Sequence, residues 1–274
     1  MSKAFLVGIN YKGSIHSLNG CINDANSMRN ILIGFYGYDP ENILIMTDDT
    51  EYKPTREMIF AGWKWLLSGA SRSQFLPNNN SIYDPITLDC KTFVFHYSGH
   101  GSQLPDDETG EESDGKDETL CPLDFEKSDM IRDDDIKTML TMKVPSQSRL
   151  ISIIDACHSS TVFDQNWTYI PHNITNYHFE GHVKINGYPD TDAEIITISG
   201  CRDDQTSADI YYNLKSQGAL TCALLATLMS RYENISYCDL IYEIFSFIRR
   251  KNLSNQVPCI SFGKNMDMSK PFTF

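Results

Sequence analysis

FVFHYSGHG at residues 93–101 and LISIIDACHSS at residues 150–160 are the two stretches that decide the fold. Each is a run of apolar and β-branched residues that stops abruptly in small and polar residues, which is typical of a buried strand followed by a tight turn. One turn carries His100 and the other carries Cys157. Because the carboxyl ends of parallel strands meet at one edge of an open sheet, where active sites are built, we expect these two side chains in one site.

Cys157 and His100 have the chemistry of a nucleophile and its base. The reactive form of cysteine is the thiolate, and a neighbouring imidazole can take the thiol proton. Two other histidines are candidates for the base. His158 follows Cys157 directly, so its side chain is expected to point elsewhere, whereas His96 lies within the strand pattern and is expected to be packed. The alternative for Cys157 is a small buried apolar residue without chemistry.

Length and charge limit the class of protein. A chain of 274 residues forms one large α/β domain or two small ones, and 41% apolar residues permit an ordinary core. The formal net charge of −13 argues against nucleic acid as the main partner, because a phosphate backbone would be repelled. It favours a cationic ligand, a cationic substrate or a metal ion, although simple solubility would also explain it.

The eight cysteines show neither a CxxC pair nor the spacing of a structural zinc site. They are therefore expected to be free thiols in a reducing compartment, which we take to be the cytoplasm. The first apolar run is too short for a signal peptide, and no stretch has the length of a membrane span. No membrane partner is expected.

Strand-like and helix-like patterns alternate along the chain, which predicts βαβ units and a mainly parallel sheet. Expected strands lie at residues 4–9, 42–46, 92–96, 149–154, 193–199 and 258–262. Expected helices lie at residues 23–33, 55–67, 133–140, 218–229 and 239–249. Residues 71–89 are polar and rich in Pro and Asn, so they are expected to form an exposed loop. Residues 161–190 have no clear hydrophobic period and are expected to form a linker or surface excursion.

Four blocks in order resemble the metacaspases, a branch of the caspase-like cysteine peptidases of clan CD, family C14. The blocks are LNGCINDA (18–25), HYSGHG (96–101), DACHS (155–159) and SGCRDDQTSAD (199–209). The gap of 57 residues between His100 and Cys157 is close to the caspase spacing of about 50. The resemblance covers nearly the whole chain. It looks like a type I member. The chain begins at the first strand, so we expect either a member without a prodomain or a truncated chain.

This resemblance implies one caspase-like domain over residues 1–274. Its fold would be an α/β three-layer sandwich, with a mainly parallel central β-sheet and helices on both faces. Residues 1–165 would form the large part, 166–192 a linker and 193–274 the small part. The resemblance further implies that Cys157 is the nucleophile, that His100 is the base, and that main-chain N–H groups of Gly101 and Cys157 hold the oxyanion.

The resemblance also implies an acidic pocket for the substrate residue before the cleaved bond, termed P1. Its walls would be Cys21, Asp24, Ser98 and Asp155. Two carboxylates suit a bidentate guanidinium and also accept an ammonium, so Arg or Lys is the expected P1 residue. Caspases proper use arginines there and cleave after Asp. The alternative role for Asp24 is a helix N-cap.

A second acidic set is implied to bind Ca²⁺. By the resemblance its ligands are Asp117, Asp133, Asp134 and Asp164. No window has the EF-hand pattern, so the site would be assembled from distant segments, and a hard cation would relieve the repulsion between the carboxylates. The alternative is a solvated acidic loop followed by an acidic helix start.

The expected function is therefore a calcium-dependent cysteine endopeptidase that cleaves after Arg or Lys. Its partners would be protein or peptide substrates with a basic P1 residue, and the protein is expected to be a monomer. Three alternatives remain open. They are a catalytically silent caspase-like scaffold, a calcium-sensing interaction module, and another peptidase of the clan with arginine or acidic preference.

Overall fold

Five apolar runs pair as parallel neighbours at the centre of the molecule. They are β1 (Ser2–Gly8), β2 (Ile43–Thr47), β3 (Thr92–Ser98), β7 (Arg149–Asp155) and β10 (Glu194–Ser199). The structure is a computed structural model that describes residues 2–77, 92–105, 116–157, 162–163, 165–171, 179–183, 190–200, 209–212, 215–231, 235–253 and 256–274. Nearly every residue of these five strands is buried, as expected for parallel strands covered on both faces.

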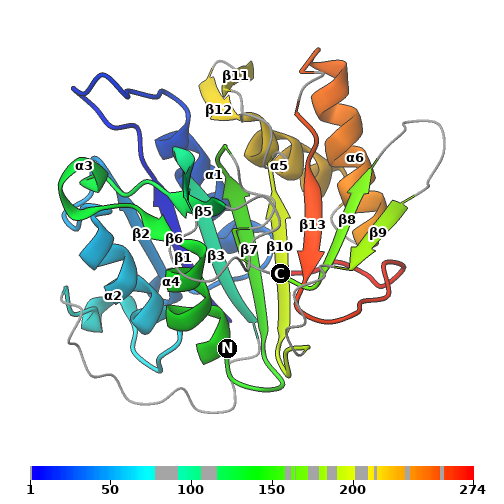
Figure 1. The fold of residues 1–274 in the computed structure, drawn as a ribbon, viewed down its shortest axis with the longest axis horizontal. Coiled ribbons are helices and arrows are strands. Elements are labelled where there is room, and N and C mark those ends of the chain that lie inside the picture. Colours follow the sequence, from blue (N-terminus) through cyan, green and yellow to red (C-terminus); the bar gives the residue numbers. More distant parts are fainter. Residues whose placement is uncertain are drawn as a thin grey trace.

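Three antiparallel strands extend the sheet at one edge, giving the order β2-β1-β3-β7-β10-β13-β8-β9. They are β13 (Cys259–Phe262), β8 (Trp167–Pro171) and β9 (Phe179–Val183) (Figure 1). The last two lie where the sequence suggested a linker without regular structure. Residues 167–170 are only half-buried, so this segment lacks the alternation that marks a strand in a sequence.

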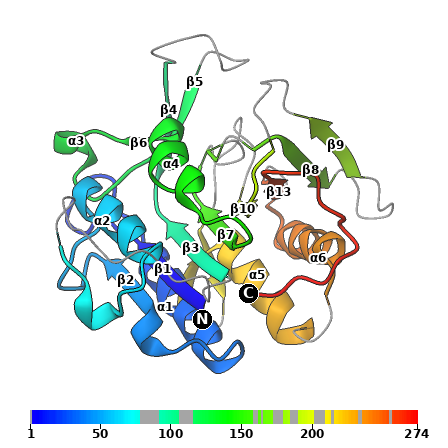
Figure 2. The same cartoon turned by 90° about the horizontal axis from the view of Figure 1, so that it is seen from below.

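Helices cover both faces of the sheet. On one face lie α2 (Arg56–Leu66) and α4 (Asp133–Met139), and on the other lie α1 (Cys21–Gly34), α5 (Ala219–Arg231) and α6 (Tyr237–Arg250) (Figure 2). Thr55 begins α2 by accepting a hydrogen bond from the N–H of Met58, and Ser236 begins α6 in the same way through Asp239. The predicted three-layer α/β sandwich with a mainly parallel sheet is confirmed.

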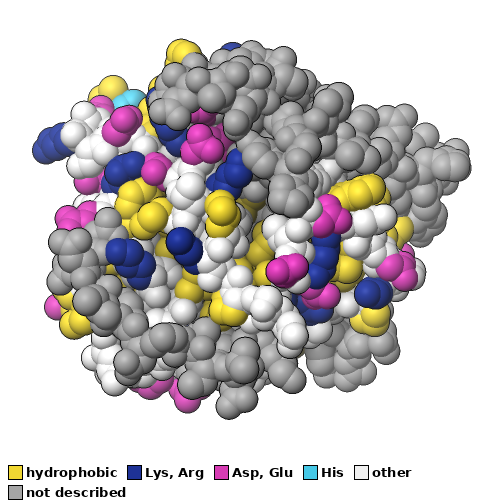
Figure 3. All heavy atoms as spheres, turned by 60° about the horizontal axis from the view of Figure 1, so that its bottom comes forward, with side chains coloured by type: hydrophobic (Ala, Val, Ile, Leu, Met, Phe, Trp, Pro, Cys, Tyr) yellow, Lys and Arg dark blue, Asp and Glu magenta, His cyan; other side chains and the backbone are white. Residues whose placement is uncertain are grey.

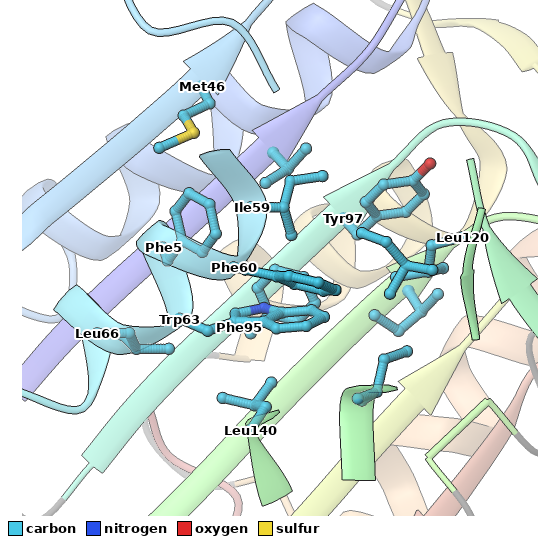
Figure 4. Close-up of a cluster of buried hydrophobic side chains, with 14 of the residues drawn as sticks. Phe5, Met46, Ile59, Phe60, Trp63, Leu66, Phe95, Tyr97, Leu120 and Leu140 are labelled. Atoms are coloured by element: carbon cyan, nitrogen blue, oxygen red, sulfur yellow. The ribbon is translucent and has the colours of Figure 1, made fainter. Parts of the chain in front are cut away.

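Each face has its own apolar core. The α2 and α4 side is rich in aromatic residues, among them Phe5, Phe60, Trp63 and Phe95, which lie together in Figure 4. Aliphatic residues from α1, α5 and α6 dominate the opposite side. The Tyr97 ring belongs to the aromatic core, but its hydroxyl makes hydrogen bonds near the carboxyl edge of the sheet.

Smaller elements surround this frame. A three-stranded sheet comprises β4 (Gly101–Pro105), β5 (Lys116–Leu120) and β6 (Ile131–Arg132), and a hairpin comprises β11 (Asp209–Tyr212) and β12 (Lys215–Gly218). Helix α3 (Phe125–Ser128) and the 3₁₀ turns η1 (Pro40–Asn42), η2 (Arg72–Gln74) and η3 (Thr141–Lys143) complete the described elements. No helix in the described ranges is both long and apolar enough to cross a membrane.

Candidate active site

The register between β3 and β7 brings the two predicted catalytic residues to one edge of the sheet. Ser98 pairs with Asp155 at the ends of these strands, and His100 and Cys157 each lie two residues further on. The main-chain N–H of Gly99 donates to the carbonyl of Asp155 at 3.3 Å, which keeps the two turns together. The spacing in the sequence suggested His100 and Cys157 as partners. The register of β3 and β7 brings the two turns that carry them close together.

Gly101 and Cys157 lie with their main chains in close approach. A Cβ atom built on Gly101 would lie 2.1 Å from the carbonyl oxygen of Cys157, so any larger residue would force the two turns apart. These are the two residues expected to supply the oxyanion donors. Their proximity is compatible with that expectation.

The imidazole of His100 has one nitrogen already engaged. Its Nε2 lies 2.8 Å from the carbonyl oxygen of His16. Since a carbonyl only accepts hydrogen bonds, Nε2 carries the single proton of the neutral imidazole, whose lone pair is then on Nδ1. The ring is thus held in the tautomer that a general base requires.

His96 is excluded as the base by its surroundings. It is fully buried, its Nε2 lies 3.2 Å from the hydroxyl of Thr221, and burial lowers its pKa to about 3. His96 therefore stays neutral and packed inside the molecule, as its place in the strand pattern predicted. His158 lies outside the described residues.

Cys157 is one of two half-buried cysteines in the described ranges. The other is Cys238, whereas Cys21, Cys121, Cys222 and Cys259 are buried, and all six are free thiols. Burial raises the pKa of Cys121 to about 12, with a smaller contribution from the charge of Cys157. Burial also raises the pKa of Cys238, which lies on α6. Cys121 is therefore an inert thiol close to the proposed nucleophile.

The predicted pocket residues lie at the same edge. Asp24, in the first turn of α1, accepts hydrogen bonds at Oδ2 from the Ser98 hydroxyl at 2.7 Å and from the Gly218 N–H at 2.9 Å. Asp155 accepts at Oδ2 from the N–H of Thr221 at 2.8 Å. Asp24, Ser98 and Asp155 are 0%, 1% and 4% exposed, so both carboxylates are buried at this edge of the sheet. Cys21 begins α1 and is buried beside Gly8.

Both pocket carboxylates converge on the start of α5. Gly218 and Thr221 lie just before and within its first turn, where helix N–H groups lack partners inside the helix. Asp24 and Asp155 therefore bind the positive end of α5, and Asp24 does not act as the N-cap of α1, where Gly20 takes that position. Burial, followed by the charges of both aspartates, raises the pKa of Cys222 to about 12.

Comparison with known proteins now gives the family. The caspase-domain family model matches residues 1–268. Metacaspase-1 of Arabidopsis thaliana is 37% identical over 254 residues, which cover 90% of this chain and 64% of that protein. Metacaspase-1 of Cryptococcus neoformans is 33% identical, covering 97% and 63%, and that of Meyerozyma guilliermondii is 30% identical, covering 98% and 71%. The chain belongs to the metacaspases.

Solved structures share the metacaspase fold at lower identity. A protein from Geobacter sulfurreducens aligns with a TM-score of 0.60 at 22% identity, over 97% of this chain and 94% of that one. Caspase-1 from Spodoptera frugiperda aligns with a TM-score of 0.53 at 13% identity, over 95% and 85%. These likenesses concern the fold alone. The chain spans less than two thirds of the Arabidopsis and Cryptococcus metacaspases.

Two of the four predicted calcium ligands make polar contacts within the chain. Asp117, 4% exposed, is ion-paired with Arg132, and Asp133 accepts the N–H groups of Glu118 at 3.1 Å and Asp134 at 2.8 Å. Asp134 is exposed, and Asp164 lies outside the described residues. Among the residues described, no three His, Cys, Asp or Glu side chains gather closely enough to hold a metal ion. In this arrangement Arg132 supplies the positive charge at Asp117.

A pocket of about 470 Å³ lies at the opposite edge of the sheet. It is lined by η3, by residues 190–193 and by Ile195 at the amino end of β10. Figure 3 shows the face at the amino ends of the strands, where hydrophobic side chains lie among charged ones. This pocket is remote from Cys157 along the strands and is not part of the candidate active site.

Several contacts at the candidate active site could not be predicted from the sequence. The carbonyl of His16, the phenol of Tyr11 and the N–H groups of Gly218 and Thr221 all reach the predicted site from distant segments. The sequence offered one weak signal, because the block at residues 18–25, which includes the start of α1, already contained Asp24. Nothing in the sequence marks Gly218 or Thr221 as neighbours of the two aspartates.

Proposed function

We propose that this protein is a cysteine endopeptidase that cleaves peptide bonds after Arg or Lys with a Cys157/His100 dyad. The observation that carries the proposal is the β3–β7 register, which places His100 and Cys157 at equal distances beyond the paired Ser98 and Asp155. Membership in the metacaspases supports the cysteine-peptidase class. The two buried aspartates at the same edge support a basic P1 residue.

The chemistry follows from the tautomer of His100. Its Nδ1 takes the proton of the Cys157 thiol, and the thiolate attacks the carbonyl carbon of the scissile peptide. Main-chain N–H groups of Gly101 and Cys157 would stabilise the oxyanion. The imidazolium then gives its proton to the leaving amine, and water, activated by the same imidazole, releases the acyl group from Cys157.

The substrate side chain would enter above Asp24 and Asp155. Their carboxylates are ordered by Ser98, Gly218 and Thr221 before any substrate binds. A guanidinium or ammonium would find two negative charges already held in place, so little reorganisation accompanies binding. A P1 aspartate would be repelled by the same charges.

Calcium activation is a second part of the proposal, and its support is the sequence pattern. Because Arg132 is paired with Asp117, calcium could use that carboxylate only after Arg132 is released. No catalytic step above depends on the ion. We further propose a reducing cytoplasmic setting, which the free cysteines of the described ranges support. We also propose that the protein is a monomer.

The test is cleavage of fluorogenic peptides with Arg, Lys or Asp at P1, by wild type and Cys157→Ala, with and without calcium. The proposal expects Arg and Lys peptides to be cleaved by wild type alone. Cleavage only after Asp, or undiminished activity of Cys157→Ala, contradicts it. A thiol-reactive probe with Arg at P1 distinguishes an enzyme from a silent scaffold, which would not be labelled at Cys157.

A further inference from the structure

Tyr11 has an unusual backbone conformation beside the active site. Its φ angle is +48°, in the left-handed region that bulky side chains rarely adopt. The N–H and hydroxyl of Ser14 both donate to the Tyr11 carbonyl, at 3.1 and 2.8 Å, and stabilise this turn. A strained residue at a candidate active site calls for a functional explanation.

The phenol of Tyr11 contacts His100 in two ways. Its hydroxyl accepts the main-chain N–H of His100 at 2.9 Å and donates to the carbonyl of Cys121 at 2.6 Å. Its ring lies against the imidazole, with the ring centroids 4.7 Å apart and the planes tilted by 38°. Tyr11 is 2% exposed, so these contacts are shielded from water.

The same loop also contacts a ring nitrogen of the imidazole. Five residues after Tyr11, the carbonyl of His16 fixes Nε2 of His100. One turn between β1 and α1 therefore contacts the main chain, the ring face and one ring nitrogen of His100. Nδ1 is left for the thiol.

We propose that Tyr11 is a positioning residue for His100, acting on the orientation of the base and on its protonated form. This inference rests on the proposed role of His100 as the base. When the imidazole takes the thiol proton, the adjacent aromatic face stabilises the imidazolium. Since that charge forms only during the reaction, losing Tyr11 lowers kcat more than it changes KM.

Tyr97 provides a matched control within the same network. It is also fully buried, and its hydroxyl lies 2.9 Å from the carbonyl of His100 and 2.8 Å from that of Cys121. The His100 carbonyl, however, also accepts the N–H of Cys121 at 3.1 Å. In the described part of the chain, the hydrogen bond made by the His100 N–H is the one to Tyr11. Removing the Tyr11 hydroxyl therefore takes the hydrogen-bond acceptor from the His100 N–H, whereas removing the Tyr97 hydroxyl leaves the His100 carbonyl with the Cys121 N–H.

The experiment compares Tyr11→Phe and Tyr97→Phe, each of which removes one buried hydroxyl from the Cys121 carbonyl. We expect Tyr11→Phe to lower kcat on an Arg peptide about tenfold with KM changed less than about twofold. Tyr97→Phe should lower kcat no more than about threefold. Tyr11→Leu, which also removes the ring, should lower kcat further than Tyr11→Phe.

The alkylation rate of Cys157 by iodoacetamide gives a readout that needs no peptide substrate. His100→Ala defines the rate without the base, and Tyr11→Phe should lie between it and wild type. Suppose that wild type cleaves no Arg or Lys peptide while Tyr11→Phe is still alkylated at a rate between those of wild type and His100→Ala. That result would contradict the proposed substrate preference and support the role of Tyr11. If His100→Ala reacts as fast as wild type, the base itself is wrongly assigned and the inference falls with it.

Gly99→Ala tests the same contacts without deleting a hydroxyl. A Cβ on Gly99 would lie 2.8 Å from the Tyr97 hydroxyl and 3.0 Å from that of Tyr11, so both phenols must shift. We expect a fall in kcat like that of Tyr11→Phe, which keeps the test decisive if Tyr11→Phe folds poorly. Equal kcat in Tyr11→Phe and Tyr97→Phe, or an effect of Tyr11→Phe confined to KM, overturns the inference.

Discussion

The main-chain N–H of Thr221 donates a 2.8 Å hydrogen bond to Oδ2 of Asp155. This contact joins the end of a central strand to the first turn of α5, so one carboxylate caps a helix and also lies at the proposed P1 pocket. The helix start favours the ionised carboxylate, which is the form that a cationic side chain needs. Under the proposed function, Asp155 would therefore both stabilise α5 and contribute to the P1 preference.

An asparagine at position 155 tests the negative charge of Asp155 separately from its hydrogen bond to the start of α5. Asp155→Asn retains a side-chain oxygen for Thr221 but loses the negative charge, and Asp24→Asn does the same toward Ser98 and Gly218. Each variant should lower kcat/KM for Arg and Lys peptides by about 10²-fold, because a charge-assisted contact in a buried site is lost. Steady-state kinetics with both peptides measures this.

The matched control is Asp239→Asn, which changes an exposed acid in the first turn of α6. It should leave kcat/KM unchanged. If Asp155→Asn and Asp24→Asn keep wild-type preference for basic peptides, their only role is to cap α5.

The placement of His100 and Cys157 at one edge of the sheet could be predicted, because its signal is local. An apolar run that ends in a small-residue turn specifies both a strand and its functional end, so the parallel sheet follows from the pattern. The contacts of Tyr11, Gly218 and Thr221 could not be predicted. They depend on the packing of segments more than 60 residues from their partners in the chain.

The acidic set illustrates the same limit. In the sequence, Asp117 and the run from Asp133 to Asp135 appear uncompensated. The antiparallel register of β5 and β6 pairs Thr119 with Arg132, which brings the guanidinium to Asp117. A sequence does not show register between short strands, so the internal counter-charge was missed.

Lys3 should be a large contributor to stability. It is fully buried, and its Nζ donates to the carbonyls of Trp65, Ser68 and Ala70 at 2.6, 2.8 and 2.8 Å, closing the carboxyl end of α2. Lys3→Met leaves these acceptors without that donor and should lower the free energy of unfolding by about 3 kcal/mol. Urea denaturation measures the change.

Lys12→Met serves as the comparison, because the ion pair of Lys12 with Asp49 is exposed, with side chains 53% and 58% accessible. Lys12→Met should lower the free energy of unfolding by less than about 1 kcal/mol. Equal decreases in the free energy of unfolding of Lys3→Met and Lys12→Met would mean that the three hydrogen bonds from Lys3 to carbonyl groups contribute little to stability.

His96 should make stability depend on pH. Its pKa falls from 6.5 to about 3 in the folded protein, so below pH 6.5 the unfolded chain binds a proton that the folded one does not. The stability present above pH 6.5 is therefore lost as the pH falls toward 3, by about 1.4 kcal/mol per pH unit. Between pH 7 and 5, wild type should lose about 2 kcal/mol more than His96→Gln, measured by urea denaturation at each pH.

Glutamine is chosen because its amide can still reach the Thr221 hydroxyl, which His96 contacts at 3.2 Å. The two proteins differ only at residue 96, so the difference between their stability curves isolates that side chain. Parallel stability curves for the two proteins would show that His96 is protonated in the folded state.

Arg132 should weaken any binding of calcium at the acidic set. Its pair with Asp117 is partly buried, with side chains 25% and 6% accessible, and must break before the carboxylate can bind a metal ion. Arg132→Met should raise calcium affinity about tenfold, measured by calorimetry in a Cys157→Ala background that prevents self-cleavage. Arg56→Met is the matched control, because it removes the same charge from a neighbouring pair with Asp135 at 2.7 Å. An equal gain in both variants would mean a general charge effect, and no binding in either would remove calcium from the proposed function.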